Sequence, residues 1–369
     1  MLSKVEWGEY KIIDVFNVKN TQCILSRDVS PEVNGTPYLC AGSENNAVSA
    51  YIKYDTRYLD KGNCIFIGGK TLVVTYQKED FYSNDSHNLA LYLKNIFKAS
   101  RATYLFLASC VYQGLKNKYS WGDSISYKKI QSDKIKLPTL NGEIDFDFME
   151  RFVAELEALR VAELEAYLTA TGLKDYELTV AEQKALEDFE KQNITWKAVT
   201  YKSVFNHIKQ GRRLKKEDQL PGTIPFVMAG TTNTGVVGYI SNPVASFPKN
   251  SITIDIFGNA FYRSYAFGAG DDTGVYWNTQ ADYTSKQMLF FTSSMEKSIA
   301  GKFSYGKKLR SSQSLDIKMY VPVVSGDIDL DFMDTLISAI QKLIIKDVVQ
   351  YSDRKIAATK QCCTNNKTC

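Results

Sequence analysis

The segment GEIDFDFM at residues 142–149 returns as GDIDLDFM at residues 326–333, 184 positions later. The same offset relates KYSWG at residues 118–122 to KFSYG at residues 302–306. Both acidic segments stand directly before apolar residues with helical spacing. Repeats that keep one order along a chain indicate duplication of a structural unit. The sequence therefore predicts two related halves, each ending in a long helix.

Blocks nearer the start of each half support the same duplication. Residues 35–42 align with residues 222–230, and Trp7 opens the first half as Trp196 opens the second. Short runs of β-branched and aromatic residues, separated by Gly, Asn and Asp, predict strands in each half. The clearest runs are residues 38–40, 64–67, 71–76 and 251–256. We therefore predict an α+β fold with two β-rich domains related by internal duplication.

Helices are predicted after each β-rich segment. Apolar residues repeat at intervals of three and four over residues 146–168, and Gly172 suits the end of that helix. A second stripe of this kind starts at Met333. A shorter helix is expected to begin at Thr179, because Glu182 would complete a capping box. Each long stripe could cover its own domain or pack on the other helix, and the sustained heptad-like spacing favours a coiled coil of the two helices.

These patterns divide the chain into predicted parts of different charge. They are a β-rich domain at residues 1–145, a helical spacer at 146–195, a second β-rich domain at 196–325, a distal helix at 326–360 and a polar tail at 361–369. The first three carry net charges of +3, −7 and +8, and the last two together carry zero. Two positive domains on either side of a negative spacer are typical of polyanion-binding modules. Chance asymmetry would explain +3, but it explains +8 over 130 residues poorly.

No residue pattern in the chain predicts catalysis. The turn at residues 68–71 resembles a phosphate-binding loop, but Cys64 stands where a Walker A motif needs glycine. The histidines His87 and His207 belong to different halves and have no supporting nucleophile or metal motif. We therefore expect no catalytic residue, no metal and no cofactor.

Two further clusters have ordinary structural explanations. Acidic residues at the helix starts are first-turn acids that complement the helix dipole rather than paired catalytic carboxylates. Seven cysteines without regular spacing fit reduced thiols, and those of the tail lack a nearby fourth metal ligand. The residues concerned are Asp145, Asp147, Asp329 and Asp331, and Cys362, Cys363 and Cys369.

The hydropathy of the chain predicts its cellular location. No apolar run approaches the ~20 residues needed to cross a bilayer. The first seven residues lack the apolar core of a signal peptide. With the reduced thiols, these features predict a cytoplasmic protein that has no membrane partner.

Several of these residues carry a resemblance to a known family. They are the openings at Trp7 and Trp196, the asparagines Asn45, Asn46 and Asn233, the step Ile135-Lys136-Leu137-Pro138, and the helix starts at Phe146 and Leu330. With them, residues 5–360 resemble the specificity (S) subunit of type I restriction-modification systems. The resemblance implies two target recognition domains, each reading one half of a split duplex DNA site, separated by an antiparallel coiled coil. It also implies docking of two modification (methyltransferase) subunits and leaves open whether restriction nuclease subunits join them.

One departure from that family concerns the helix starts. Many type I subunits have a Glu-Gln pair after the proline step, whereas this chain has Asn141-Gly142 and Ser325-Gly326. The variant looks like the specificity subunits of type IIB-like systems, in which one partner chain carries both methylation and cleavage. The DNA-reading role is unaffected, and the identity of the partner stays open between the two systems.

Contacts to DNA should divide between phosphate-binding Lys and Arg and base-reading Asn and Gln. In the first domain we expect them from Asn45, Asn46, Lys70, Tyr76, Gln77, Lys78, Lys116, Lys118, Lys128 and Lys129. In the second domain we expect them from Arg212, Arg213, Lys215, Lys216, Asn233, Asn259, Arg263, Lys302, Lys307, Lys308 and Arg310. One such charge alone is typical of a solvated surface, but recurrence in both halves favours DNA contact.

Two other classes of function stay open from the residues alone. One is an enzyme, either a nuclease or a methyltransferase in its own right, and the other is a duplicated protein- or sugar-binding module. The lack of a catalytic motif weighs against the enzyme, and the +8 charge with reduced cysteines weighs against the module. We therefore predict a non-catalytic DNA-recognition subunit.

Overall fold

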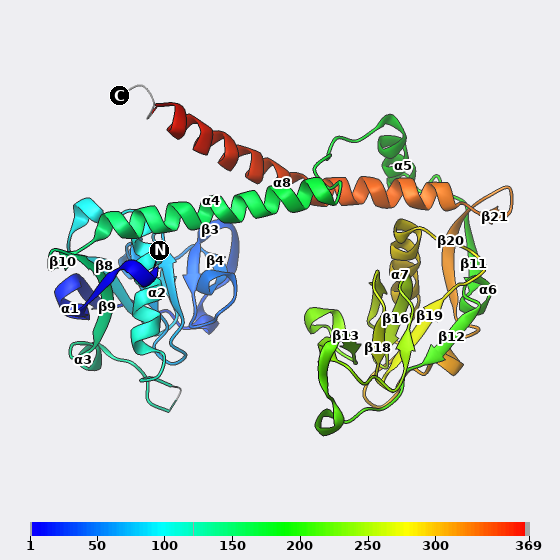
Figure 1. Ribbon diagram of the computed structural model, residues 1–369, viewed down its shortest axis with the longest axis horizontal. Helices are drawn as coiled ribbons and strands as arrows, with labels where there is room; N and C mark the ends of the chain where they lie inside the picture. The colour runs from blue at the N-terminus through cyan, green and yellow to red at the C-terminus, as the bar shows by residue number, and fades with distance from the viewer. Residues whose placement is uncertain (1, 121, 366–369) are drawn as a thin grey trace. The chain divides into compact units, whose positions relative to one another are not determined.

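The computed structural model describes residues 2–120 and 122–365, and beyond residue 358 it describes the backbone alone (Figure 1). The chain forms two compact units, Met1–Leu164 with Lys355–Cys369 (unit 1) and Glu165–Arg354 (unit 2). Trp121 of the repeated KYSWG segment and the predicted cluster of tail cysteines lie outside the described side chains.

Unit 1 contains short strands and helices that lead into a long helix. Its strands are β1 (Glu6–Lys11), β2 (Phe16–Asn20), β3 (Pro31–Leu39), β4 (Val48–Ile52), β5 (Cys64–Ile67), β6 (Val74–Gln77), β7 (Tyr82–Ser83), β8 (Leu89–Leu93), β9 (Lys134–Leu140) and β10 (Glu143–Ile144). Its α-helices are α1 (Ile12–Val15), α2 (Arg101–Leu115), α3 (Tyr127–Ile130) and the greater part of α4 (Phe146–Ala170). Its 3-10 turns are η1 (Leu2–Lys4), η2 (Ser26–Asp28), η3 (Asn45–Ala47), η4 (Thr56–Tyr58) and η5 (Ile96–Lys98).

Unit 2 repeats this order and adds one helix before its first strand. Its strands are β11 (Trp196–Thr200), β12 (His207–Gln210), β13 (Pro221–Val227), β14 (Val236–Ile240), β15 (Ser246–Phe247), β16 (Ser251–Asp255), β17 (Ala260–Arg263), β18 (Phe267–Ala269), β19 (Thr273–Trp277), β20 (Lys318–Val324) and β21 (Asp327–Ile328). Its α-helices are α5 (Val180–Glu190), α6 (Tyr201–Val204), α7 (Ser285–Ile299) and the greater part of α8 (Leu330–Asn365). Its 3-10 turns are η6 (Lys216–Asp218), η7 (Thr232–Gly235) and η8 (Ser311–Gln313).

The sheets of the two units correspond one to one. Unit 1 has the strand orders β1-β9-β10, β2-β8-β5-β6 and β4-β3-β7, and unit 2 has β11-β20-β21, β12-β19-β16-β17 and β14-β13-β18-β15. The registers agree as well, because Trp7 lies opposite Pro138 as Trp196 lies opposite Pro322. The predicted duplication and the α+β fold are therefore confirmed.

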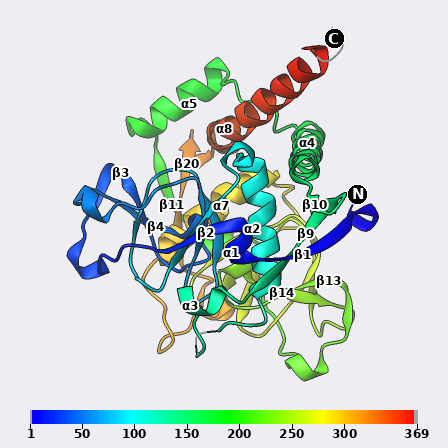
Figure 2. The ribbon, with the colours of Figure 1, turned by 90° about the vertical axis from the view of Figure 1, so that its left-hand side faces the viewer.

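One helix in each unit fills the core beside the four-stranded sheet. Helices α2 and α7 bury apolar side chains such as Leu107 and Phe291, and a serine or threonine caps each N-terminus. Figure 2 shows α2 beside the first turns of α4, where Phe106 meets Phe148 edge to face at 6.0 Å. The start of each long helix belongs to the same core, since Met149 and Met333 are fully buried.

The predicted helix boundaries on either side of the α4–α5 connection are confirmed. Helix α4 ends at Ala170, and Gly172 follows with a φ of +70°, a left-handed conformation that glycine adopts without strain. Helix α5 begins after Thr179, whose hydroxyl accepts the Glu182 N–H while the Glu182 carboxylate accepts the Thr179 N–H. The sequence therefore specified these ends through local hydrogen bonding.

Each long helix packs in both of the ways that the sequence allowed. Its first turns join the core of its own unit, and later turns lie against the other long helix. Within unit 1, Lys355 of α8 lies 3.4 Å from Glu157 of α4, and within unit 2, Ser352 donates to Glu165 at 3.3 Å. The antiparallel coiled coil of the two long helices stays a prediction. The apolar stripes are incompletely covered, however, because Leu159 and Ile344 remain 55% and 72% exposed.

One predicted strand is shorter than expected. Strand β6 begins at Val74 rather than at Thr71, because the Leu72 N–H bonds to the Gly68 carbonyl and closes a turn. Leu72 adopts a φ of +52°, which a strand cannot contain. The predicted domain boundaries stay predictions.

Candidate nucleic-acid interface

A strained loop stands at the same place in both units. Residues 45–47 of unit 1 all have positive φ, at 46°, 53° and 69°, and residues 233–235 of unit 2 repeat this with 47°, 51° and 83°. The first asparagine closes each loop, because the Asn45 and Asn233 side chains donate to the carbonyls of Val48 and Val236. Consecutive left-handed residues are costly, and such strain concentrates at functional sites. The two loops are therefore the first candidates for specific contacts.

A buried polar side chain donates hydrogen bonds to each strained loop from the interior of its unit. Gln77 and Arg263 occupy the same position on β6 and β17, because they pair with Cys64 and Ser251 at the starts of β5 and β16. Gln77 donates to the Asn46 carbonyl at 2.9 Å, and Arg263 donates to the Thr234 carbonyl at 2.5 Å. Arg263 also donates to the hydroxyls of Thr234, Thr253 and Tyr265. Burial lowers the pKa of Arg263, but the guanidinium keeps four hydrogen-bond acceptors.

Several other loops gather beside the strained loop of unit 2. The Leu309 N–H donates to the Ile256 carbonyl, and the Ile256 N–H donates to the Asp272 carbonyl, both at 2.9 Å. Asp255 accepts the Gly230 N–H at 3.1 Å, and Arg310 donates to the Asp271 carbonyl at 2.5 Å. We call this surface the loop end of unit 2, and it comprises residues 211–212, 228–235, 255–259, 270–273 and 302–311.

Unit 1 has a matching loop end. The Ile125 N–H donates to the Gly69 carbonyl at 3.1 Å, as that of Leu309 does to Ile256 in unit 2. The Gly69 N–H donates to the Asn88 side chain, and the Thr71 hydroxyl donates to the Ala41 carbonyl. The loop end of unit 1 comprises residues 40–47, 68–73, 83–88, 118–120 and 122–125.

Arg212 and the cations of residues 302–310 lie at the loop end of unit 2, and all of the predicted Lys and Arg contacts of unit 2 except the buried Arg263 are exposed. Arg212, Arg213, Lys302, Lys307 and Lys308 have no carboxylate within 4.0 Å among the residues that the structure describes, while Lys215 lies 3.7 Å from Glu217. Lys307 and Lys308 lie over the rings of Phe303 and Tyr305. Unpaired cations are available to bind phosphate.

The predicted lysines of unit 1 are more often engaged. Lys70 pairs with Asp85 at 2.9 Å, Lys78 with Glu79 at 3.0 Å and Lys118 with Asp133 at 2.9 Å. Lys129 pairs with Asp123. Donors from His87 and Lys70 outweigh the effect of burial at Asp85 and lower the pKa of that carboxyl to about 2. Lys116 and Lys128 are exposed, without an ion pair among the described residues.

Four predicted contact residues make structural contacts within unit 1 or unit 2. Gln77 and Arg263 are 5% and 1% exposed, so they position the loops and cannot reach DNA from there. Tyr76 stacks on Tyr104 at 5.3 Å, with its hydroxyl bonded to Asn63. The Asn259 side chain donates to Asp255 within its own turn. Sequence alone could not separate these residues from exposed ones, because strand register decides which side chains face inward.

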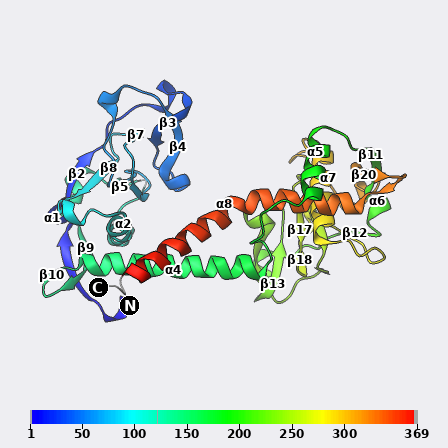
Figure 3. The same cartoon turned by 90° about the horizontal axis from the view of Figure 1, so that it is seen from above.

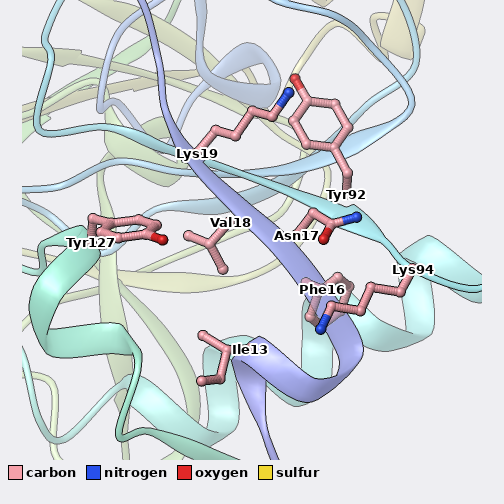
Figure 4. Close-up of a pocket in the computed structure, with 8 residues that line it drawn as sticks. All are labelled: Ile13, Phe16, Asn17, Val18, Lys19, Tyr92, Lys94 and Tyr127. Carbon is pink, nitrogen blue, oxygen red and sulfur yellow. The ribbon is translucent and has the colours of Figure 1, made fainter.

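Unit 1 also has a polar pocket of about 440 Å³ that no sequence pattern predicted, shown in Figure 4. It lies along the edge strand β2 and is lined by Lys19, Lys94, Asn17 and Tyr127 among others. The Lys19 ammonium lies over the Tyr92 ring, 5.5 Å from its centroid. Nothing in the sequence singled these lysines out, because neither belongs to a cluster or to a repeated block.

The whole arrangement has relatives among known proteins. Residues 4–166 and 193–351 match the type I restriction modification DNA specificity domain. The chain belongs to this family. It carries two copies of the domain and is a specificity subunit, a non-catalytic component of restriction-modification complexes. The predictions of a DNA-recognition role and of a chain without enzymatic activity are thereby confirmed.

Individual relatives agree with this assignment. The chain is 23% identical to the type II restriction enzyme BgcI specificity subunit S.BcgI of Heyndrickxia coagulans over 356 residues, which are 94% of this chain and 97% of that protein. The crystal structure of the type I restriction-modification S subunit from M. genitalium has the same fold. Its TM-score is 0.59 at 14% identity, and the match covers 97% of this specificity subunit and 94% of that chain.

No group of three or more His, Cys, Asp or Glu side chains stands ready to hold a metal ion in the part of the chain that the structure describes. None of the described helices is long and apolar enough to cross a membrane.

Proposed function

We propose that this specificity subunit reads a bipartite duplex DNA site, with the loop end of each unit contacting one half-site. The observation that carries the proposal is the recurrence of one loop arrangement in both units, with the strained loop held from inside by Gln77 or Arg263. A loop that internal hydrogen bonds already hold in one conformation loses little conformational entropy on binding. This favours specific contact.

The proposed contacts divide by chemistry. Most lie in the loop ends, while Lys78, Lys116, Lys128 and Lys129 lie outside the loop end of unit 1. Asn45, Asn46 and Asn233 are exposed, and each side-chain amide donates one hydrogen bond, to the carbonyl of Val48, Tyr76 or Val236. The amide oxygen and the second N–H of each are suited to adenine edges. The exposed lysines and arginines are suited to phosphates, which set the register of the protein on the duplex. The proposed phosphate-binding set is Lys70, Lys78, Lys116, Lys118, Lys128, Lys129, Arg212, Arg213, Lys215, Lys216, Lys302, Lys307, Lys308 and Arg310. We add Lys19 and Lys94 of the pocket in Figure 4 as phosphate-binding candidates.

The proposed partners are two methyltransferase subunits, which would dock on the long helices. The exposed apolar residues Ile344 and Val348 support this, because uncovered apolar side chains on helices favour partner binding. The relative from a type II enzyme favours the alternative of one partner chain that carries both methylation and cleavage. Copurification of the subunit with each candidate partner from its own host would decide between the two. The cytoplasmic location remains a prediction.

The test uses the complete complex and maps its methylated or footprinted sites. Substitution Asn45→Ala should relax base preference in one half-site, and Asn233→Ala should relax it in the other, each by about 1–3 kcal/mol. Lys191→Ala at the end of α5, which belongs to neither loop end, is the control and should change neither half-site. A site that is not split, or two asparagine variants that relax the same bases, would contradict the proposal.

A further inference from the structure

The two units differ at the groove between the long helix, the core helix and the first strand. In unit 1 this groove has a volume of about 1090 Å³ and is lined by Trp7, Leu105, Phe106, Phe152 and Leu156 among others. All of its lining residues belong to unit 1. Leu156 is 42% exposed there, although it lies on the apolar stripe of α4.

The walls of the groove are the same in unit 2. Trp7 stacks on Phe106 with ring centroids 6.4 Å apart and an interplanar angle of 16°. Trp196 stacks on Phe290 at 6.3 Å and 15°. Phe290 follows Phe106 by the same 184 residues that separate the two long helices. The two places are therefore equivalent.

In unit 2, α5 and the residues leading into it cover that place. Phe189 meets Trp196 edge to face at 6.4 Å, and Leu186 packs against the core. Glu182 lies 3.1 Å from Lys342 of α8, and Figures 1 and 3 show α5 beside the first half of α8. The covered turns of α8 include Ala339, which is fully buried, whereas its counterpart Glu155 on α4 is exposed.

We propose that the groove of unit 1 binds an acidic amphipathic helix of a partner protein, with a leucine and an aromatic residue three positions apart. Helix α5 is the pattern for this occupant, since Leu186 and Phe189 have that spacing. It carries Glu182, Glu187, Asp188 and Glu190 against one lysine. The groove of unit 1 is lined by three lysines, of which Lys118 is paired with Asp133 and Lys134 with Glu9, so its complementary charge comes from Lys136. Lys136 has no carboxylate within 4.0 Å among the described residues.

In unit 2 the equivalent place is covered by a helix of the same chain, whereas the proposal places a helix of another protein in the groove of unit 1. An aromatic side chain of the partner would pack against Trp7, and a leucine would pack beside Leu156. Removal of Trp7 and Leu156 from water would be the main favourable contribution to the free energy of docking. This binding does not depend on DNA, so it can succeed or fail separately from the proposed half-site reading.

The test uses a fluorescent peptide of residues 173–192 and the full chain. We expect saturable binding, measured by fluorescence anisotropy, that Leu156→Asp weakens at least tenfold and Lys136→Glu weakens about threefold. Leu159→Asp is the matched control, because Leu159 is exposed on the same helix but does not line the groove. It should change binding less than twofold. Leu156→Gln repeats the test with an uncharged change, and thermal melting checks that each variant is folded.

Several outcomes would overturn the proposal. They are the absence of saturable binding, equal weakening by the Leu156 and Leu159 variants, and unchanged binding to Leu156→Asp, which would mean that the peptide displaces α5 in unit 2. A peptide with Leu186 and Phe189 changed to Ala should bind at least tenfold more weakly. If the free chain sediments as a dimer that Leu156→Asp converts to a monomer, a second copy closes the groove and the separate partner is excluded.

Discussion

The two units share one arrangement of strands and helices but place different side chains at equivalent positions. Gln77 supports the strained loop of unit 1, and Arg263 supports that of unit 2. Asp60 of unit 1 bridges to Phe81 at the place where Phe247 of unit 2 pairs with Phe267. The units differ in the buried side chains that bond to the strained loops and in the charged side chains exposed at the loop ends. A duplicated recognition domain can therefore diverge without changing its strand order.

The largest expected effect concerns the supports of the strained loops. Arg263→Ala removes four hydrogen bonds and leaves a cavity, so we expect unit 2 to lose about 2–4 kcal/mol of free energy of unfolding. Gln77→Ala removes fewer bonds and should cost unit 1 about 1–2 kcal/mol. Urea denaturation followed by hydrogen exchange in each unit measures both values.

The exchange Arg263→Gln sharpens the same comparison, because it places the residue of unit 1 into unit 2. It should restore part of the stability that alanine removes, through a bond to the Thr234 carbonyl. If Arg263→Ala costs no more than Gln77→Ala, the larger hydrogen-bond set of Arg263 does not stabilise its loop.

The next effect is a pH dependence confined to unit 1. Burial raises the pKa of Asp60 to about 6, despite the Gln22 N–H that donates to its carboxylate. The folded state therefore binds a proton that the unfolded state has released, and stability falls as pH rises from about 4 to 6. Asp60→Asn keeps an acceptor for Gln22 and removes the charge. It should stabilise unit 1 by about 1–2 kcal/mol at pH 7.5 and by nothing measurable near pH 3.5.

Unit 2 provides the internal control for this prediction. Phe247 occupies the equivalent position and cannot titrate, so unit 2 should show no matching change in stability over the same pH interval. Hydrogen exchange at several pH values separates the units. An Asp60→Asn variant whose stability follows pH as the unsubstituted protein does would refute the assignment.

The third effect contrasts the predicted DNA-binding cations of the two units. Arg212 and Arg213 are exposed and have no carboxylate within 4.0 Å in the described chain, whereas Lys118 and Lys129 are ion-paired. Arg212→Ala should therefore weaken duplex binding by about 1 kcal/mol and reduce the salt slope by about 0.9 for one lost phosphate contact. Lys129→Ala should weaken it less, because the lysine must first leave Asp123. Equal losses for the two variants, measured by salt titration, would show that ion pairing does not distinguish the units.

The sequence predicted features that depend on neighbours along the chain better than features that depend on packing. The capping box of Thr179 and Glu182, the helix end at Gly172 and the repeated blocks were all found, because each is written in a few adjacent residues. The inward direction of Arg263 and Gln77 was missed, because it follows from strand register. The three consecutive left-handed residues of each loop were also missed, since Ala47 and Thr234 give no local signal of such a conformation.

The smallest expected effect concerns the contacts that hold α5 on unit 2. These contacts distinguish the covered groove of unit 2 from the open groove of unit 1. Burial alone would raise the pKa of Glu182, but donors from Thr179, Ser338 and Lys342 outweigh it and lower the pKa to about 2. The charged carboxylate therefore stabilises the docked helix above pH 4.5, and this stabilisation is lost as pH falls toward 2. Glu182→Gln should weaken the protection of α5 amides at pH 7 by about 0.5–1 kcal/mol.

The control for this variant lies on the same helix. Glu187 pairs with Lys191 at 2.9 Å on the solvent side, so Glu187→Gln should leave amide protection unchanged within error. The difference between the two glutamate variants should shrink as the pH is lowered toward 2, because Glu182 then becomes neutral in the unsubstituted protein too. If Glu187→Gln opens α5 as much as Glu182→Gln does, helix propensity rather than docking holds α5 in place, and the covered groove of unit 2 loses its value as the pattern for unit 1.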